Sequence, residues 1–278
     1  MTPHRRFALL GHPVGHSISP TMMQPALDLL APGARYEAAD VAPGDLRGNL
    51  SDLVARGYSG FNLTHPHKVA VASMVQRLST AARRCGAINC VAVEDDGRLT
   101  GYNTDLGGIR YVLEGLHPAP RAGLLLWAGG AARATAAALE DLGIPAPAFS
   151  TRSPDTAASF RRFFPAATGH PWYRLSEPAF AAGFDLVVNC TPVGMLPAAD
   201  ETPLAGAFHP DQTVLDLIYN PRPTRLLREA AAAGARTVDG LVMLAVQGAL
   251  ALTIWLALDE APVDQLIGIA EGALPATW

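Results

Sequence analysis

The sequence has 278 residues, of which 49% are hydrophobic and 17% are charged, and its formal net charge is −4. This length suits two domains of ordinary size, and the apolar share excludes a disordered chain. The acidic balance argues against a general nucleic-acid binder, because phosphate backbones attract basic surfaces. Three scattered cysteines without a CxxC pair predict a reducing, cytoplasmic setting and no metal site.

The first third of the sequence alternates apolar runs with helical segments, which is typical of a mainly parallel α/β sheet. We expect strands at 7–10, 35–41 and 60–63, and helices at 19–30, 46–55 and 69–78. Ser19 is expected to cap the first of these helices, with Pro20 in its first turn. Asp95-Asp96-Gly97 separates strands expected at 88–93 and 98–101, and predicts a hairpin that adds an antiparallel edge.

The rest of the sequence repeats this alternation. Strands are expected at 124–127, 148–151, 185–189 and 214–217, and helices at 106–116, 131–142, 224–233, 241–258 and 263–273. The segment 241–258 is apolar apart from Gln247 and Thr253, and as a helix it would reach about 27 Å, the short end of a membrane span. Its acidic flanks and the lack of a Lys/Arg cluster predict a buried helix of a soluble enzyme, with no membrane partner.

Lys68 is the single lysine, although the chain has 21 basic residues in all. An arginine-rich composition explains the other cations and makes this exception informative. A guanidinium stays protonated, whereas an ammonium can give and take a proton. We therefore take Lys68 as a candidate for acid–base chemistry, with a chance exception as the alternative.

Polar segments follow several of the predicted strands, where ligands bind in open α/β sheets. Lys68 and Asp105 lie in two such segments and form a candidate acid–base pair, in which the carboxylate holds the ammonium in place. A plain structural salt bridge is the alternative. Ser17 and Ser19 precede a helix, and two hydroxyls at a helix N-terminus can bind a carboxylate.

A glycine-rich turn, Ala128-Gly129-Gly130-Ala131-Ala132-Arg133, joins a predicted strand to a predicted helix. Such a turn can hold a pyrophosphate on its N–H groups, although an ordinary tight turn explains two glycines equally well. Trp127 stands where the full dinucleotide fingerprint has its first glycine. The next strand ends at Thr151-Arg152-Ser153, where an arginine suits the 2′-phosphate of NADP. An exposed surface arginine is the alternative at this position.

Seven segments, in this order, make the chain resemble the shikimate dehydrogenase family over nearly its whole length. They are Gly15-His-Ser-Ile-Ser-Pro20, Asn62-Leu-Thr-His-Pro-His-Lys68, Gly86-Ala-Ile-Asn89, Asn103-Thr-Asp105, Asn189-Cys-Thr-Pro-Val-Gly-Met195, Asp216-Leu-Ile-Tyr219 and Asp239-Gly-Leu-Val-Met-Leu-Ala-Val-Gln247. The resemblance implies an α/β fold with a substrate-binding and catalytic domain at 1–105 plus 239–278, and a Rossmann-like NADP-binding domain at 106–238. It also implies the reversible, NADP-dependent reduction of 3-dehydroshikimate to shikimate, a step toward chorismate and the aromatic amino acids.

The same resemblance implies which residues form the site. Lys68 and Asp105 are the implied catalytic pair. The residues implied to bind substrate are Ser17, Ser19, Thr64, Asn89, Asp105, Tyr219 and Gln247. The residues implied to bind the cofactor are Ala128, Gly129, Gly130, Ala131, Ala132, Arg133, Thr151, Arg152, Ser153, Thr191, Met195, Gly240 and Met243.

Two alternative functions remain open. A quinate/shikimate dehydrogenase that uses NAD would carry the same motifs, since quinate differs by one ring hydroxyl. A ring-acid binding protein would keep the substrate pocket, while Trp127 would close the nucleotide site. The partners expected in every case are small molecules, and the chain is expected to be a monomer or a homodimer.

Overall fold

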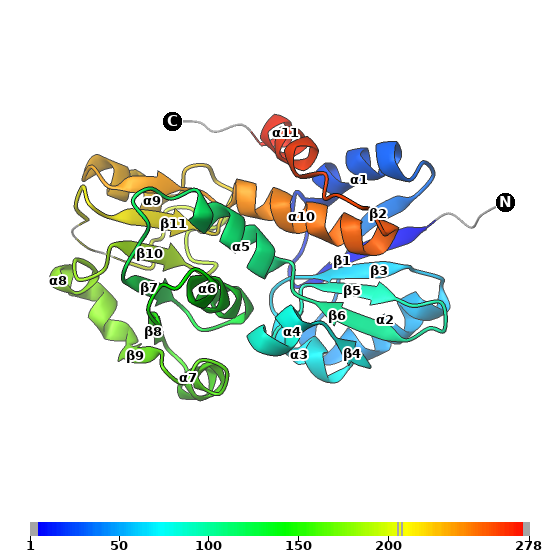
Figure 1. Ribbon diagram of the computed structural model, residues 1–278, viewed down its shortest axis with the longest axis horizontal. Coiled ribbons are helices and arrows are strands. Elements are labelled where there is room, and N and C mark those ends of the chain that lie inside the picture. Colours follow the sequence, from blue (N-terminus) through cyan, green and yellow to red (C-terminus); the bar gives the residue numbers. More distant parts are fainter. Residues whose placement is uncertain (1–4, 205, 207, 275–278) are drawn as a thin grey trace. The chain divides into compact units, whose positions relative to one another are not determined.

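The computed structural model describes residues 5–204, 206 and 208–274 (Figure 1). The chain divides into two compact units. Among the described residues, the first comprises 5–107 together with Ala245–Ala273, and the second comprises Gly108–Leu244 together with Leu274. The divisions fall inside two helices, α5 (Asp105–Glu114) and α10 (Leu241–Leu256), so each of these helices contributes to both units.

The first unit contains a mixed six-stranded sheet in the order β2-β1-β3-β5-β6-β4. Its strands are β1 (Arg6–Gly11), β2 (Arg35–Asp40), β3 (Gly60–Leu63), β4 (Arg77–Leu78), β5 (Cys90–Val93) and β6 (Leu99–Tyr102). β1 runs parallel to β2 and β3, whereas β5 runs antiparallel to both β3 and β6. The predicted hairpin is therefore confirmed, but its place at the sheet edge was wrong, because β4 pairs with β6 beyond it.

The helices of the first unit agree with prediction except at 69–78, and α4 was not predicted. They are α1 (Ser19–Leu30), α2 (Leu46–Ala55), α3 (His67–Ala70), α4 (Thr80–Cys85) and α11 (Val263–Ala273), with short 3₁₀ turns at Pro43–Asp45 and Val71–Ser73. The helix expected at 69–78 was wrong. There the chain leaves α3 and joins the sheet, because Gln76 donates its N–H to the carbonyl of Leu99 at 3.0 Å and accepts the N–H of Leu99 with its side chain at 2.7 Å.

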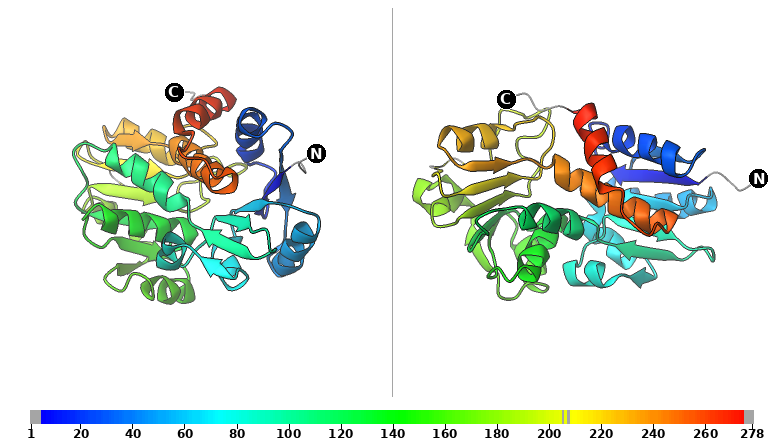
Figure 2. Two further views of the ribbon diagram at one scale, coloured as in Figure 1. Left: turned by 45° about the vertical axis from the view of Figure 1, so that its right-hand side comes forward. Right: turned by 45° about the horizontal axis from the view of Figure 1, so that its top comes forward.

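Apolar packing on both faces of the first sheet holds this unit together. The indole of Trp255, on α10, stacks on Phe7 of β1 with ring centroids 4.6 Å apart, and its Nε1 donates to the carbonyl of Val91 at 2.9 Å. A Cβ at Gly60 would overlap this indole, so the close approach of α10 requires glycine there. Burial of one such large apolar side chain stabilises a fold by about 1.5–3 kcal/mol. In both views of Figure 2, α1 and α11 lie side by side, and they pack together.

The second unit contains six parallel strands in the order β12-β11-β10-β7-β8-β9. They are β7 (Gly123–Leu126), β8 (Ala148–Thr151), β9 (Thr168–Pro171), β10 (Leu186–Asn189), β11 (Thr213–Asp216) and β12 (Arg236–Val238). The order reverses between β7 and β10, which is the switch point where doubly wound sheets bind ligands. The expected Rossmann-like fold is confirmed, although β9 and β12 were not predicted.

Short helices complete the second unit. They are α6 (Gly130–Asp141), α7 (Pro154–Arg161), α8 (Pro178–Ala181) and α9 (Arg225–Ala232), with a 3₁₀ turn at Trp172–Ser176. The hydroxyl of Thr224 caps α9 and that of Ser153 caps α7, each accepting a backbone N–H from the first helical turn.

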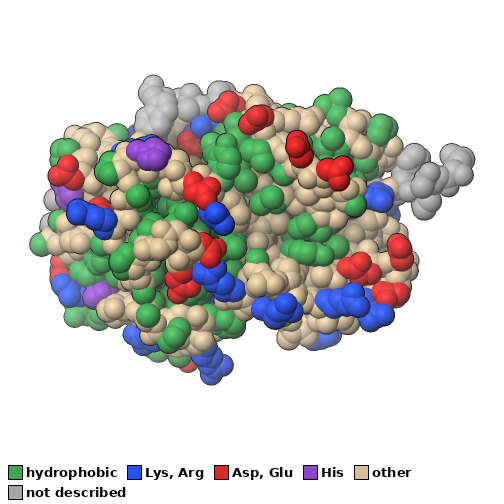
Figure 3. Space-filling view, viewed as in Figure 1, with side chains coloured by type: hydrophobic (Ala, Val, Ile, Leu, Met, Phe, Trp, Pro, Cys, Tyr) green, Lys and Arg blue, Asp and Glu red, His purple; other side chains and the backbone are tan. Residues whose placement is uncertain are grey.

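No helix in the described part of the chain is long and apolar enough to cross a membrane. On the face that Figure 3 shows, acidic and basic side chains are interspersed.

Candidate active site

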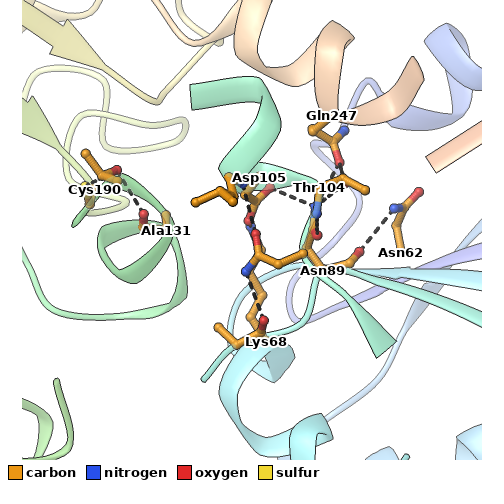
Figure 4. Close-up of polar contacts among 12 residues, drawn as sticks. Asn62, Lys68, Asn89, Thr104, Asp105, Ala131, Cys190 and Gln247 are labelled. Atoms are coloured by element: carbon orange, nitrogen blue, oxygen red, sulfur yellow. Dashed lines mark hydrogen bonds and ion pairs between the residues drawn. The ribbon is translucent and has the colours of Figure 1, made fainter. Parts of the chain in front are cut away.

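Lys68 and Asp105 form a close ion pair in the first unit (Figure 4). Lys68 follows β3 on the short helix α3, and Asp105 is the first residue of α5, directly after β6. The Nζ of Lys68 lies 2.6 Å from Oδ2 of Asp105, and their side chains are 20% and 3% exposed. The N-terminus of α5 favours the negative charge of Asp105, because its backbone dipoles point positive there. The ammonium is thus held in place yet open on one side.

Asn89 joins this ion pair to Gln247, on α10. Its Nδ2 donates to Oδ1 of Asp105 at 2.8 Å and lies 2.8 Å from Oγ1 of Thr104 and 3.1 Å from Oε1 of Gln247. Its Oδ1 accepts the N–H of Thr104 at 2.6 Å. A buried amide with several partners is held in one orientation, because each lost hydrogen bond would leave a buried polar atom unsatisfied. Four predicted site residues therefore lie in one polar network: Lys68, Asp105, Asn89 and Gln247.

Two further residues support this network, although no role was predicted for them from the sequence. Asn62 donates to the carbonyl of Asn89 at 3.1 Å and accepts from the hydroxyl of Tyr36 at 2.8 Å. Asn103 accepts the N–H of Leu106 at 3.0 Å and so fixes the start of α5. A buried asparagine in the apolar strand β3 was the available signal, because buried amides need specific partners.

Ser17 and Ser19 lie together at the N-terminus of α1, with their Oγ atoms 3.1 Å apart. The prediction that Ser19 caps this helix was wrong, because Ser19 is its first residue and Ile18 occupies the cap position. Ser17 accepts the N–H of Ser19 at 3.2 Å instead. Thr64 follows β3 and donates its N–H to the carbonyl of Leu10 at 2.9 Å. Tyr219 follows β11 and belongs to the second unit, whereas the other predicted substrate residues belong to the first.

Two titratable side chains beside the pair are kept uncharged by burial. Burial lowers the pKa of His65, and the positive charges of His67 and Lys68 lower it further. His65 is therefore neutral near pH 7 and adds no competing charge. Burial also raises the pKa of the Cys90 thiol, and the negative charge of Asp105 adds to this effect. Cys90 consequently stays a thiol and adds no negative charge beside Asp105.

The glycine-rich turn lies between β7 and α6, at the switch point of the second sheet. Gly129 is the N-cap of α6, and no side chain of the described residues caps this helix. The hydroxyls of Ser150 and Thr151, at the end of the neighbouring strand β8, are buried without a hydrogen-bond partner among the residues that the structure describes. An uncapped helix start and unsatisfied hydroxyls fit a phosphate-bearing ligand, which would supply acceptors to both.

The predicted cofactor residues around this turn have different surroundings. Arg133 is buried: its Nη2 donates to Oγ of Ser159 at 2.7 Å, and its guanidinium lies 4.8 Å from the centre of the Phe163 ring. Arg152 follows β8 and covers Trp172, with Cζ 4.8 Å from the ring centre. Arg133 thus braces α6 against α7, whereas Arg152 lies beside the end of β8, where the 2′-phosphate of a dinucleotide is recognised.

A second buried network shapes the loop after β10. Asn189 donates to Oδ1 of Asp216 at 2.9 Å and accepts the N–H and the hydroxyl of Thr191 at 3.0 and 2.7 Å. Burial raises the pKa of Asp216 to about 7, although hydrogen bonds from Ile218, Thr224 and Asn189 act in the other direction. The two hydrogen bonds to Asn189 fix Thr191, and the same loop carries Met195.

Gly240 and Met243 lie at the start of α10. A Cβ at Gly240 would overlap the backbone of Leu217, at the end of β11, so this glycine allows a close approach of two chain segments. Met243 is 6% exposed. Both residues belong to the second unit, as the loop after β10 does.

Comparison with known proteins bears directly on these residues. The sequence profile described as "Shikimate dehydrogenase substrate binding domain" matches residues 9–91, which include Ser17, Ser19, Thr64, Lys68 and Asn89. The chain is 42% identical to a protein of Moorella thermoacetica named shikimate dehydrogenase (NADP(+)), over an alignment of 278 residues that covers 96% of this chain and 93% of that protein.

Two solved structures resemble the chain over nearly its whole length. Shikimate 5-dehydrogenase from Thermus thermophilus, in complex with NADP(H) and shikimate, is 38% identical with a TM-score of 0.82, and the match covers 97% of this chain and 100% of that one. A shikimate dehydrogenase in complex with NADP+ is 32% identical with a TM-score of 0.84, and the match covers 98% of this chain and 96% of that one. The chain therefore belongs to the shikimate dehydrogenase family.

Proposed function

We propose that this protein catalyses the reversible, NADP-dependent reduction of 3-dehydroshikimate to shikimate. The observation that carries the proposal is the Lys68–Asp105 ion pair, bound through Asn89 to Gln247. Lys68 is a cation that can give up a proton, and a buried carboxylate fixes it beside two amides that can bind hydroxyl groups. This arrangement suits proton transfer to or from a keto or hydroxyl group on a polar ring. The names and bound ligands of the relatives support the same reaction.

Lys68 moves the proton in this reaction. When NADP(H) is bound, it supplies the hydride in reduction and accepts it in oxidation. In reduction, the ammonium of Lys68 donates a proton to the oxygen of the carbonyl group that is being reduced, as negative charge develops on it, and in oxidation the neutral amine takes the proton of the hydroxyl back. Asp105 holds the Nζ of Lys68 at 2.6 Å and balances its charge. Such general acid–base help accelerates a reaction by about 10²–10⁴-fold.

The remaining first-unit residues would bind the ring. Asn89 and Gln247 offer amide groups beside the ion pair, and Thr64 adds a hydroxyl at the end of the central strand β3. Ser17 and Ser19 present two hydroxyls at the N-terminus of α1, whose dipole favours a carboxylate. Tyr219 is proposed as a further substrate-binding residue. These groups match the functional groups of shikimate, which are a carboxylate and ring hydroxyls.

The second unit would hold NADP(H). The turn at Ala128–Arg133 and the start of α6 would bind the pyrophosphate, and Thr151, Arg152 and Ser153 would surround the 2′-phosphate. The loop with Thr191 and Met195, together with Gly240 and Met243, would border the nicotinamide.

The domains proposed on this basis are 1–105 plus 239–278 for substrate and 106–238 for the cofactor. Because none of the three cysteines, all of them described, forms a disulfide, a reducing cytoplasmic setting is proposed too.

A steady-state assay tests the proposal directly. Shikimate oxidation is followed by NADPH absorbance, with NADP and NAD in parallel and with quinate in place of shikimate. We expect the highest kcat/KM for shikimate with NADP. Preference for quinate or NAD would favour the quinate-type enzyme instead. Ring-acid binding without dinucleotide binding or turnover would exclude the dehydrogenase and leave a binding protein.

A further inference from the structure

Trp127, the residue directly after β7, has a backbone conformation that favours glycine. Its φ is 101°, and its N–H nevertheless donates to the carbonyl of Ser150 at 2.8 Å, so the pairing of β7 with β8 continues through it. A large side chain is crowded against its own backbone at such an angle, and residues held there are strained. The surrounding sheet imposes this conformation, and glycine would adopt it without strain.

The indole of Trp127 fills the space beside Gly129. A Cβ built on Gly129 would lie 2.7 Å from Nε1 and 2.8 Å from Cδ1 of Trp127, closer than real atoms approach. In dinucleotide-binding turns the second glycine lacks a side chain so that the pyrophosphate can approach the backbone. Gly129 holds that position of the turn, at the N-cap of α6. The indole of Trp127 therefore occupies the space that Gly129, lacking a side chain, leaves beside the backbone.

An aromatic contact holds the indole there. Trp127 meets Trp172 edge to face, with ring centroids 6.4 Å apart and ring planes at 88°. Arg152 lies over Trp172, with its Cζ 4.8 Å from the ring centre. Edge-to-face pairs and cations over indole rings are both attractive arrangements. The contacts connect the turn after β7 with the segments that follow β8 and β9.

We infer that Trp127 sets the dinucleotide affinity of this protein by competing with the pyrophosphate for the space beside Gly129. NADP(H) binds after the indole has moved off this glycine, so the apparent Kd equals the intrinsic Kd divided by the fraction of molecules in which the space is free. The inference rests on the proposed function, in which this turn receives the pyrophosphate. It identifies Trp127 as the residue that determines cofactor affinity, separate from the proton-transferring pair.

The test measures NADPH binding by calorimetry in the absence of ring substrate. Trp127→Gly removes the indole and relaxes the backbone, and we expect it to lower Kd by about tenfold or more and to have a higher Tm than Trp127→Ala. Trp127→Ala removes the indole but keeps a Cβ at the strained angle, so Kd falls without a gain in Tm. Trp127→Phe keeps an aromatic ring and stays near the wild-type Kd. Tyr173→Ala, which removes an aromatic side chain that is 67% exposed, is the matched control and leaves Kd unchanged.

Adenosine 2′-monophosphate distinguishes competition at the turn from a general effect on the second unit. This ligand carries the 2′-phosphate but no pyrophosphate, so its Kd is expected to be the same in wild type and Trp127→Gly. An equal gain for both ligands would overturn the inference, since the effect would then lie outside the turn. Unchanged or weaker NADPH binding in both Trp127→Gly and Trp127→Ala would also overturn it.

These outcomes separate the inference from the proposed function. Tighter NADPH binding in Trp127→Gly, with no turnover of shikimate, would support the inference and contradict the proposed reaction. Equal NADPH binding in all variants, with normal shikimate turnover, would do the reverse. No NADPH binding in any variant would contradict both.

Discussion

Lys68 and Asp105 are 37 positions apart in the sequence, yet Nζ of the lysine lies 2.6 Å from Oδ2 of the aspartate. Lys68 follows β3 and Asp105 follows β6, and β5 lies between these two strands and runs antiparallel to both. Because β3 and β6 run in the same direction, their carboxyl ends meet at one edge of the sheet. The sheet order therefore creates the pair.

Replacement of Lys68 tests the proton transfer. Lys68→Ala is expected to lower kcat by about 10²–10⁴-fold with a smaller effect on KM, because proton donation helps the transition state more than binding. Lys68→Arg should be impaired too, since a guanidinium keeps its proton. The control is Arg98→Ala, which removes a cation from an exposed ion pair with Asp96 and should leave kcat unchanged. Wild-type turnover of Lys68→Arg would remove the acid–base role.

Asp105→Asn tests the charge that holds Lys68. The variant keeps the size of the side chain but loses the negative charge, and one carboxylate oxygen that accepts from Lys68 or Asn89 becomes a donor. We expect kcat to fall by about 10²-fold or more. Asp96→Asn, which changes an exposed aspartate in the same way, is the matched control. Thermal unfolding of both variants checks that the loss of activity is not a loss of fold, and equal kcat in the two variants would contradict the prediction.

Asn62 is expected to stabilise the site rather than to take part in the chemistry. Asn62→Ala removes one hydrogen bond from the carbonyl of Asn89, which keeps the N–H of Leu63 at 2.9 Å, and one from the hydroxyl of Tyr36, and each such loss costs about 0.5–1.5 kcal/mol. Urea unfolding should show this decrease in the free energy of unfolding. Asn49→Ala, whose side chain bonds at an exposed site on α2, should change it far less. Equal effects of the two substitutions would show that the Asn62 hydrogen bonds add no stability.

The raised pKa of Asp216 predicts a pH dependence of stability. Burial raises it from 3.8 to about 7 in the folded chain, so the folded state binds a proton that the unfolded state has released between these values. The resulting stabilisation is full below about pH 4 and is lost as pH rises through about 7, by up to roughly 1.4 kcal/mol per pH unit. Asp216→Asn cannot titrate.

The measurement is the difference in unfolding free energy between wild type and Asp216→Asn at several pH values. Wild type should lose stability relative to this variant as pH rises from 5 to about 8. Asp211→Asn, at an exposed position, should instead follow wild type. A constant difference between wild type and Asp216→Asn across this range would mean that Asp216 keeps an ordinary pKa in the fold.

Local sequence patterns determined much of this molecule. The bounds of α2, β3, β8 and α11 agree with the prediction because each depends on short-range features: an apolar period, a glycine stop or a capping residue. The single lysine and the glycine-rich turn pointed to two candidate functional segments for the same reason, since the identity of a side chain fixes whether it can exchange a proton or let a phosphate approach.

Only the tertiary structure decided how distant segments meet. Asn89 and Gln247 are 158 positions apart, and no local pattern encodes their contact. The strands β4, β9 and β12 form because an open sheet edge offers unpaired N–H and C=O groups, a stabilisation that lies in the partner strand and not in their own residues. The strained backbone of Trp127 has the same origin. Its conformation is imposed by strand pairing with β8, whereas its own side chain would favour another, so the sequence showed the unusual residue but not where its indole lies.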